Sequence, residues 1–66
     1  MKNTIKVERA IKGLTQEELA KKVSVSRQTI NAMEAGRYVP STLLALKIAK
    51  VFNKTVNEIF SLEKGD

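Results

Sequence analysis

Residues 14–36 read LTQEELAKKVSVSRQTINAMEAG, and this stretch decides the fold. It opens with Thr15 followed three residues later by Glu18, the capping box that begins many helices. Apolar side chains then recur at helical spacing, which predicts a helix over residues 16–23 with one buried face. The expected buried positions on this face are Leu19, Ala20 and Val23.

A second short helix follows almost at once. Residues 24–26 form a three-residue turn, and Ser26 is placed to cap a helix over residues 27–35 that ends at Gly36. Ile30 and Met33 would face inward. Two short helices joined by so tight a turn are typical of a helix-turn-helix unit, whose second helix enters the major groove of DNA.

The same capping and periodicity signals extend to both sides of this unit. They predict three further helices, over residues 5–13, 42–52 and 56–60. The fourth helix follows a loop at Pro40, because the residue before a proline avoids helical angles. The expected fold is all-α, with five short helices in one domain over residues 1–66 and a core at about residues 5–60.

Composition excludes several classes of protein. The chain has 66 residues, 42% of them hydrophobic, and contains no Cys and no His, so disulfides, zinc sites and cysteine or histidine chemistry are absent. No glycine-rich phosphate loop and no paired carboxylates are present, so we expect no enzyme activity, no cofactor and no small-molecule ligand. A core this small favours support from a second subunit.

The charge balance indicates a polyanionic partner. Twelve Lys and Arg against seven Asp and Glu give a net charge of +5, which favours nucleic acid first and an anionic membrane second. No apolar run approaches the roughly 20 residues of a membrane span, and the caps and turns would have no purpose in a membrane-surface peptide. We therefore expect double-stranded DNA as the partner, no membrane contact and a cytoplasmic location. Part of the excess charge falls on Lys47, Lys50 and Lys54. These lysines either flank the DNA or are solvated, and we favour the second interpretation.

Three segments together resemble a known family. Leu14–Ala20, Ser26–Asn31 and Met33–Gly36 match the motifs of the Cro/C1-type repressors, also called the xenobiotic-response-element family. The resemblance covers nearly the whole chain and implies a lambda-repressor-like fold and a dimeric, nucleoid-associated repressor of a prokaryotic cell. The chain departs from the family at Ser24, where a glycine with positive φ is usual, and at Met33, where an aromatic residue is frequent.

The resemblance also implies a DNA-binding surface. The family reads base edges from positions that are Arg27, Gln28 and Asn31 here, and the chemistry of these side chains suits base reading, because Arg pairs with guanine and Gln and Asn pair with adenine. Contacts to the DNA backbone are implied for the start of the second helix and for the loop after the third helix. The expected DNA-binding residues are Gln16, Ser26, Arg27, Gln28, Asn31, Arg37 and Tyr38.

A structural ion pair is implied as well. The family pairs a glutamate at the position of Glu34 with an arginine of the first helix, and Arg9 is the matching residue. The expected role is to fix the orientation of the helix that reads DNA. The alternative is a surface glutamate without a partner.

The end of the chain is the expected dimer interface. A fifth helix of one turn is too short to bury all of its large apolar residues, and exposed apolar clusters mark interfaces. The interface residues we expect are Val56, Ile59, Phe60 and Leu62. The alternative is that Phe60 and Leu62 only close the core of the monomer. Residues 60–63 could also form a short β-ribbon with residues 1–3. Dimerisation there would place two recognition helices about 34 Å apart and predicts a palindromic operator.

A protein-binding module on the same fold is the alternative function. Antitoxins of toxin–antitoxin pairs are of this kind and often carry a toxin-binding extension. Only six residues follow Phe60, so we do not expect such an extension. The sequence therefore favours a DNA-binding repressor that acts by blocking polymerase.

Overall fold

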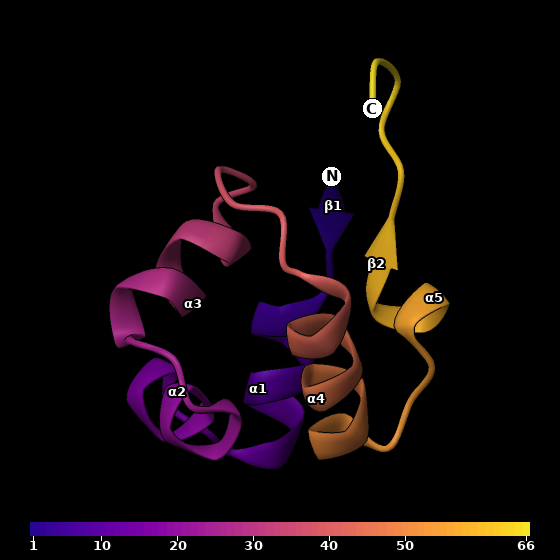
Figure 1. Cartoon of the computed structure of the whole chain (residues 1–66). Helices are drawn as coiled ribbons and strands as arrows, with labels where there is room; N and C mark the ends of the chain where they lie inside the picture. Colours follow the sequence, from indigo (N-terminus) through magenta and orange to yellow (C-terminus); the bar gives the residue numbers. More distant parts are fainter.

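The computed structural model describes residues 1–66 and contains the five expected helices and a small antiparallel ribbon (Figure 1). The predicted all-α fold with a possible ribbon is confirmed. The elements, in chain order, are β1 (Lys2–Asn3), α1 (Ile5–Lys12), α2 (Gln16–Val23), α3 (Arg27–Glu34), α4 (Thr42–Phe52), α5 (Val56–Ile59) and β2 (Phe60–Ser61).

Side-chain caps fix where four of the helices begin. Thr15 and Thr55 each form a complete capping box, in which the hydroxyl accepts from the third amide of the helix and a glutamate accepts from the capping residue. Ser26 and Ser41 cap α3 and α4 through single hydrogen bonds to the amides of Thr29 and Leu44. The predicted starts of these helices are therefore confirmed.

Left-handed residues end three of the helices. Gly13, with φ of 69°, closes α1 at no steric cost, as the sequence predicts. Ser24 has φ of 62° at the end of α2, and Asn53 has φ of 53° at the end of α4. A serine in this region carries strain because its Cβ approaches the following carbonyl oxygen. The turn of the helix-turn-helix thus has the shape that glycine usually provides.

The core lies between α2, α3 and α4. Twelve hydrophobic residues are buried: Ile5, Leu19, Ala20, Val23, Ile30, Met33, Leu44, Ile48, Ala49, Phe52, Ile59 and Phe60. All inward-facing residues predicted on α2 and α3 are among them. In α1 only Ile5 of the large apolar residues is buried, whereas Val7 and Ile11 are exposed. Periodicity therefore identified α1 as a helix, but only its first turn reaches the core.

The ribbon joins the two ends of the chain. Lys2 pairs with Ser61 and Asn3 with Phe60 in antiparallel register. The fifth helix was predicted to include Phe60, and this is wrong: Phe60 has φ of −114° and ψ of 140° and begins β2. The backbone becomes extended there because β1 offers it a pairing partner. The amino group of Met1 lies 3.2 Å from Glu63 Oε1, so charge also holds the two termini together.

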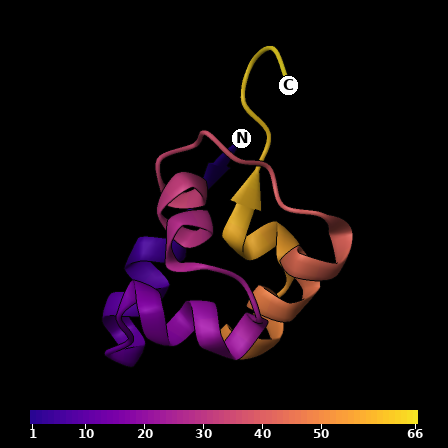
Figure 2. The ribbon, with the colours of Figure 1, turned by 60° about the vertical axis from the view of Figure 1, so that its left-hand side comes forward.

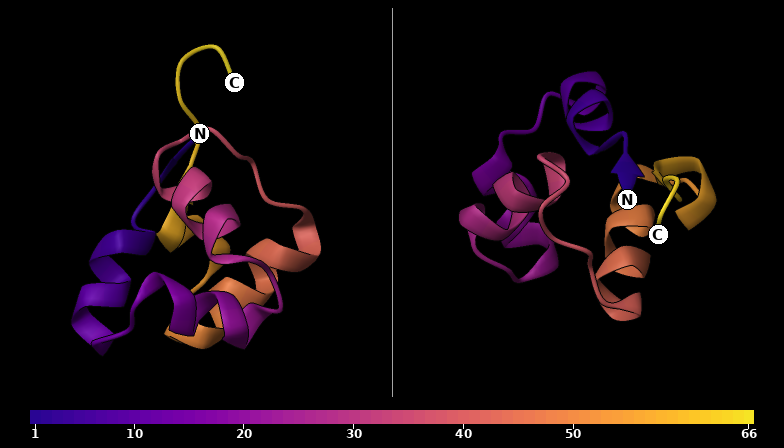
Figure 3. Two further views of the ribbon diagram at one scale, coloured as in Figure 1. Left: turned by 90° about the vertical axis from the view of Figure 1, so that its left-hand side faces the viewer. Right: turned by 90° about the horizontal axis from the view of Figure 1, so that it is seen from above.

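The helix-turn-helix and the C-terminal elements α5 and β2 lie on opposite sides of α4. In Figure 1, α2 and α3 lie on one side of α4, while α5 and β2 lie on the other, and the view from above in Figure 3 shows the same order. Each helix is too short to cross a membrane, and none reaches the required apolar length. The arrangement leaves the outer face of α3 uncovered.

Candidate nucleic-acid interface

The outer face of α3 carries polar side chains that no other element covers. With the left side of Figure 1 brought forward, α3 stands in front and rises steeply from α2 (Figure 2). Arg27, Gln28 and Asn31 are exposed, whereas Ile30 and Met33 on the other side of the same helix are buried. The helix is therefore held by its apolar face and presents three long or amide-bearing side chains to solvent.

The orientation of α3 is fixed by an ion pair to α1. Arg9 Nε donates to Glu34 Oε2 at 2.6 Å, and Arg9 Nη2 donates to Glu34 Oε1 at 3.0 Å, which is a bidentate arrangement. The side chains are only 15% and 8% exposed. Arg9 Nη1 also donates to the carbonyl oxygen of Leu14 at 2.9 Å. One guanidinium thus connects α1, α3 and the loop that leads into α2.

Gln16 extends this ion pair to the surface. Its Nε2 donates to Glu34 Oε1 at 3.1 Å, so the carboxylate receives hydrogen bonds from two different helices. A carboxylate only accepts hydrogen bonds, so the amide nitrogen of Gln16 must face Glu34 and its oxygen must face away. Gln16 Oε1 then accepts from Asn31 Nδ2 at 3.5 Å, a long contact at the exposed face. The buried ion pair therefore sets the orientation of two surface amides in turn.

Opposing effects act on the Glu34 carboxyl. Burial raises the pKa of Glu34, but the hydrogen bonds from Arg9 and Gln16 lower it, and the net result is a pKa below the ordinary value. Glu34 is therefore charged at neutral pH in spite of its burial. A charged and fully bonded Glu34 does not repel a polyanion as an exposed carboxylate would, because Arg9 neutralises it.

The N-termini of α2 and α3 carry free backbone amides. The first amides of α2 and α3 have no partner within their helices, and such ends favour anions. Gln16 is the first residue of α2, and Arg27 is the first residue of α3. Ser26 is occupied as the cap of α3, and its Oγ also lies 2.9 Å from Thr29 Oγ1. Ser26 thus has a local structural role at the position where DNA contact was predicted.

Arg37 and Tyr38 lie in the loop after α3, beyond the left-handed Gly36. Both side chains are exposed, and neither forms a hydrogen bond or an ion pair. Tyr38 lies beside Val25 and Leu43 at a shallow surface depression. The structure therefore leaves both side chains available, at the end of α3 opposite to Arg27.

The predicted dimer residues separate into two groups. Ile59 and Phe60 are only 2% and 7% exposed, so the prediction that these two are exposed at a dimer interface is wrong. The ribbon supplies the missing cover, because Phe60 pairs with Asn3 and packs into the core with Ile59. Val56 is half-buried, and Leu62 is 80% exposed. Only these last two remain available to a partner.

Sequence reasoning missed several contacts and surfaces. Leu46 and Val39 are 56% and 64% exposed and line an apolar hollow of about 230 Å³ together with Val56 and Phe60. Helical periodicity gave no signal for this, since α4 carries apolar residues on more than its buried face. Lys54 was interpreted as solvated, but its Nζ donates to the buried Glu8 at 2.8 Å. Lys54 is still 38% exposed, so the ion pair is an addition that sequence did not predict, and it forms because the segment after α4 approaches α1 in the folded chain.

The ribbon also contacts the recognition helix. Asn3 Nδ2 donates to the carbonyl oxygen of Met33 at 2.8 Å, and Asn3 Oδ1 accepts from the amide of Ile5 at 3.1 Å. One side chain therefore links β1, α1 and α3. No cluster of His, Cys, Asp and Glu side chains that could hold a metal ion is present.

Comparison with known proteins finds matches that are all described as helix-turn-helix proteins. A family model described as helix-turn-helix matches residues 5–59. The uncharacterized HTH-type transcriptional regulator MJ0272 of Methanocaldococcus jannaschii is 57% identical over 66 residues, 100% of both chains. The uncharacterized HTH-type transcriptional regulator YgzD of Bacillus subtilis is 52% identical over 64 residues, 97% of both.

A solved structure shows the same arrangement of helices. The clp gene regulator ClgR of Corynebacterium glutamicum matches with a TM-score of 0.75 and 30% sequence identity. The match covers 82% of this chain and 57% of the ClgR chain, so it spans little more than half of that protein.

Proposed function

Since this chain belongs to the Cro/C1-type helix-turn-helix family of transcriptional regulators, which bind DNA and are not enzymes, we propose that it is a repressor that binds a palindromic operator as a homodimer. The observation that carries the proposal is the outer face of α3. It is uncovered and polar, and it is held in place by an ion pair to α1. We place the protein on the nucleoid of a prokaryotic cell, as one domain over residues 1–66.

In this proposal Arg27, Gln28 and Asn31 read base edges. Arg27 offers two parallel N–H donors, which suit the N7 and O6 acceptors of guanine. Gln28 and Asn31 each offer a donor and an acceptor on one amide, which suit adenine. The amide orientation of Asn31 supports this role, because Gln16 occupies one N–H of Asn31 and leaves the other N–H and the oxygen free.

Phosphate contacts fix the protein on the duplex. The open N-termini of α2 and α3 each offer backbone amides to a phosphate, at Gln16 and at Ser26–Arg27. Arg37 and Tyr38 contact the DNA backbone from the C-terminal end of α3. The segment from Gln16 to Tyr38 carries four Lys and Arg against three Glu, a net charge of only +1. Because Arg9 neutralises Glu34, the surface is more positive toward DNA than this count suggests.

The proposed dimer surface lies on the loop before α4, on α4 and α5, and on the tail. Its residues are those that the monomer leaves exposed or half-exposed: Val39, Leu46, Val56 and Leu62. The first three line the apolar hollow of about 230 Å³. Two copies joined there by a two-fold axis would present two α3 helices to successive major grooves, about 34 Å apart. A two-fold protein requires a two-fold operator, so the site is a palindrome.

Repression is the simplest outcome of such binding. A dimer that occupies the major groove over two half-sites excludes polymerase from that stretch of DNA by its volume alone. No contact beyond the operator is needed for this effect.

Selection of bound sites from random duplex DNA tests the proposal. We expect one enriched motif of two inverted half-sites whose centres are about 10 base pairs, one helical turn, apart. Enrichment of a single asymmetric half-site would contradict the homodimer and the palindrome. Recovery of no motif above background would contradict sequence-specific binding itself. Placing the selected site across a promoter then tests repression, and transcription that rises when the protein is added would contradict it.

A further inference from the structure

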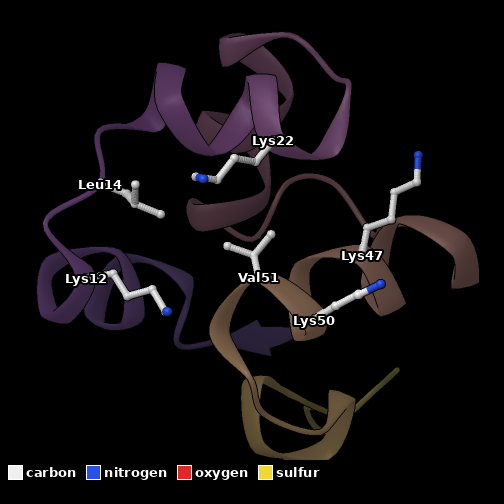
Figure 4. A pocket seen from close by; sticks show the side chains of 6 residues that line it. All are labelled: Lys12, Leu14, Lys22, Lys47, Lys50 and Val51. Carbon is white, nitrogen blue, oxygen red and sulfur yellow. The ribbon is translucent and has the colours of Figure 1, made fainter.

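A second charged surface lies outside the recognition unit. A hollow of about 580 Å³ opens between the end of α1, the second half of α2 and the middle of α4. Four lysines and two apolar residues line it: Lys12, Leu14, Lys22, Lys47, Lys50 and Val51 (Figure 4). Its volume falls within the range of small-molecule sites, which is about 300–1,000 Å³.

The charge around this hollow is not neutralised. No carboxylate lines it, although the chain has seven Asp and Glu. The ion pairs of the structure involve the amino terminus, Arg9 and Lys54, so none of the four lysines takes part in one. Like charges that share one depression repel one another, which lowers stability. An anion that occupies the hollow would relieve this repulsion.

The hollow has an apolar side as well as a charged one. Leu14 and Val51 are half-buried and face each other across it from the α1–α2 loop and from α4. Figure 4 shows the Lys22 side chain extending toward Leu14 and the Lys12 side chain ending below Leu14, while Lys47 and Lys50 point outward from α4. Four lysines around two apolar side chains suit a ligand with several negative charges and one apolar part.

We propose that this hollow binds a small organic phosphate with at least two phosphate groups and an aromatic ring, such as a nucleoside diphosphate. The phosphates would lie between Lys12 and Lys22, and the ring would cover Leu14 and Val51. A sugar–phosphate backbone of duplex DNA has the charge but presents no apolar face to these two residues. The lining residues come from α1, α2, α4 and the loop between α1 and α2, and none comes from α3.

Titration of the free, full-length protein with ADP, followed by NMR of its backbone amides, tests the proposal. We expect saturable shifts confined to the amides around Lys12, Leu14, Lys22 and Val51. The double variant Lys12→Ser with Lys22→Ser should bind ADP at least tenfold more weakly. The matched control Lys2→Ser with Lys64→Ser removes the same charge from exposed positions outside the hollow and should stay within twofold of the wild type.

Three further results would overturn the proposal. Equal weakening in the control variant would mean general attraction to a basic protein. Equal affinity for inorganic pyrophosphate and ADP would mean that Leu14 and Val51 contact no ring. Weaker operator binding by Lys12→Ser with Lys22→Ser, measured without ADP, would assign these lysines to DNA. The titration contains no DNA, so its outcome is independent of whether the proposed operator is found.

Discussion

Gln16 and Glu34 are 18 residues apart in sequence, yet Gln16 Nε2 donates to Glu34 Oε1 at 3.1 Å. This contact joins the start of α2 to the end of α3, and it reaches a carboxylate that Arg9 already binds with two hydrogen bonds. Because the carboxylate cannot donate, the contact decides which end of the Gln16 amide faces outward. A buried ion pair thereby influences the chemistry of the surface that we propose contacts DNA.

The first prediction tests this relay to Asn31. Gln16→Ala removes the acceptor that orients the Asn31 amide, so discrimination at the base pair read by Asn31 should fall, toward that of Asn31→Ala. Each good amide–base pair contributes about 1–3 kcal/mol of discrimination. Competition binding between the selected operator and one changed at that base pair measures the ratio of the affinities for the two operators.

The ratio of the two affinities distinguishes a role of Gln16 in orienting Asn31 from a role in binding phosphate. Loss of a phosphate contact at Gln16 weakens both operators equally and leaves the ratio as it was. Lys21→Ala, an exposed change on the same helix, is the matched control and should also preserve the ratio. An undiminished preference in Gln16→Ala would show that Asn31 does not depend on Gln16.

The second prediction separates base reading from phosphate binding. Arg27→Ala should cost about 1–3 kcal/mol on the selected site and relax the preference at one base pair in each half-site. Arg37→Ala should weaken binding to all sequences about equally. It should also reduce the log–log salt slope by roughly two, since each subunit of the dimer loses one phosphate contact. Binding curves at several salt concentrations check both variants, and a changed base preference in Arg37→Ala alone would reverse the roles.

The third prediction concerns the stability that Glu34 provides. Glu34→Gln leaves the Arg9 guanidinium, 15% exposed, without its charged partner. We expect a loss of about 3 kcal/mol in the free energy of unfolding, as for buried pairs that lose one member. Urea denaturation at pH 7 measures it. Glu17→Gln, an exposed carboxylate of α2, is the control and should change stability by less than about 0.5 kcal/mol.

The same ion pair makes stability depend on pH. The pKa of Glu34 is lower in the folded protein than in the unfolded chain, where it is near 4.3. Its contribution is therefore fully present above that unfolded value and is lost as pH falls through the folded pKa. The stability difference between wild type and Glu34→Gln should shrink as the pH is lowered below about 4. A difference that stays constant down to about pH 2 would contradict the depressed pKa.

The fourth prediction concerns the turn between α2 and α3. Ser24 has φ of 62°, so Ser24→Gly should relieve backbone strain and stabilise the protein. The relief of about 1–2 kcal/mol is partly offset by the greater freedom of glycine in the unfolded chain, which leaves a gain of about 0.5 kcal/mol. Thermal denaturation measures the change. Ser41→Gly serves as the control, because Ser41 has φ of −63° and caps α4, so its replacement should not stabilise.

The fifth prediction tests the proposed dimer surface. Leu46→Glu with Leu62→Glu places two charges on residues that are 56% and 80% exposed in the monomer, so the monomer should still fold. Sedimentation at micromolar concentration should show a dimer for the wild type and a monomer for this variant. Operator binding should be lost with it.

A matched control uses the apolar residues of α1. Val7→Glu with Ile11→Glu introduces the same charges at exposed positions of another helix and should leave the dimer intact. A wild-type protein that sediments as a monomer would contradict the interface. Dissociation by the control variant instead would move the interface to α1.

The sequence alone determined the elements of this protein. Capping boxes at Thr15 and Thr55, caps at Ser26 and Ser41, and Gly13 act within a few residues of themselves, so the helices could be located without knowledge of the rest of the chain. The inward positions of α2 and α3 follow from helical periodicity, which is also local. The match to a family motif added Arg9 and Glu34 as partners, which no local signal would have joined.

The tertiary structure decided everything that depends on which segments meet. Phe60 begins a strand instead of ending the fifth helix, because residues 2–3 lie beside it. That pairing buries Ile59 and Phe60, which were predicted to be exposed at an interface. Lys54 donates a hydrogen bond to Glu8, 46 residues away in sequence, and Gln16 donates one to Glu34, 18 residues away. The lysine-lined hollow likewise arises from three helices. Such contacts are set by how the helices pack, since hydrogen bonds and charges act over a few ångströms in space and carry no signature in the order of residues.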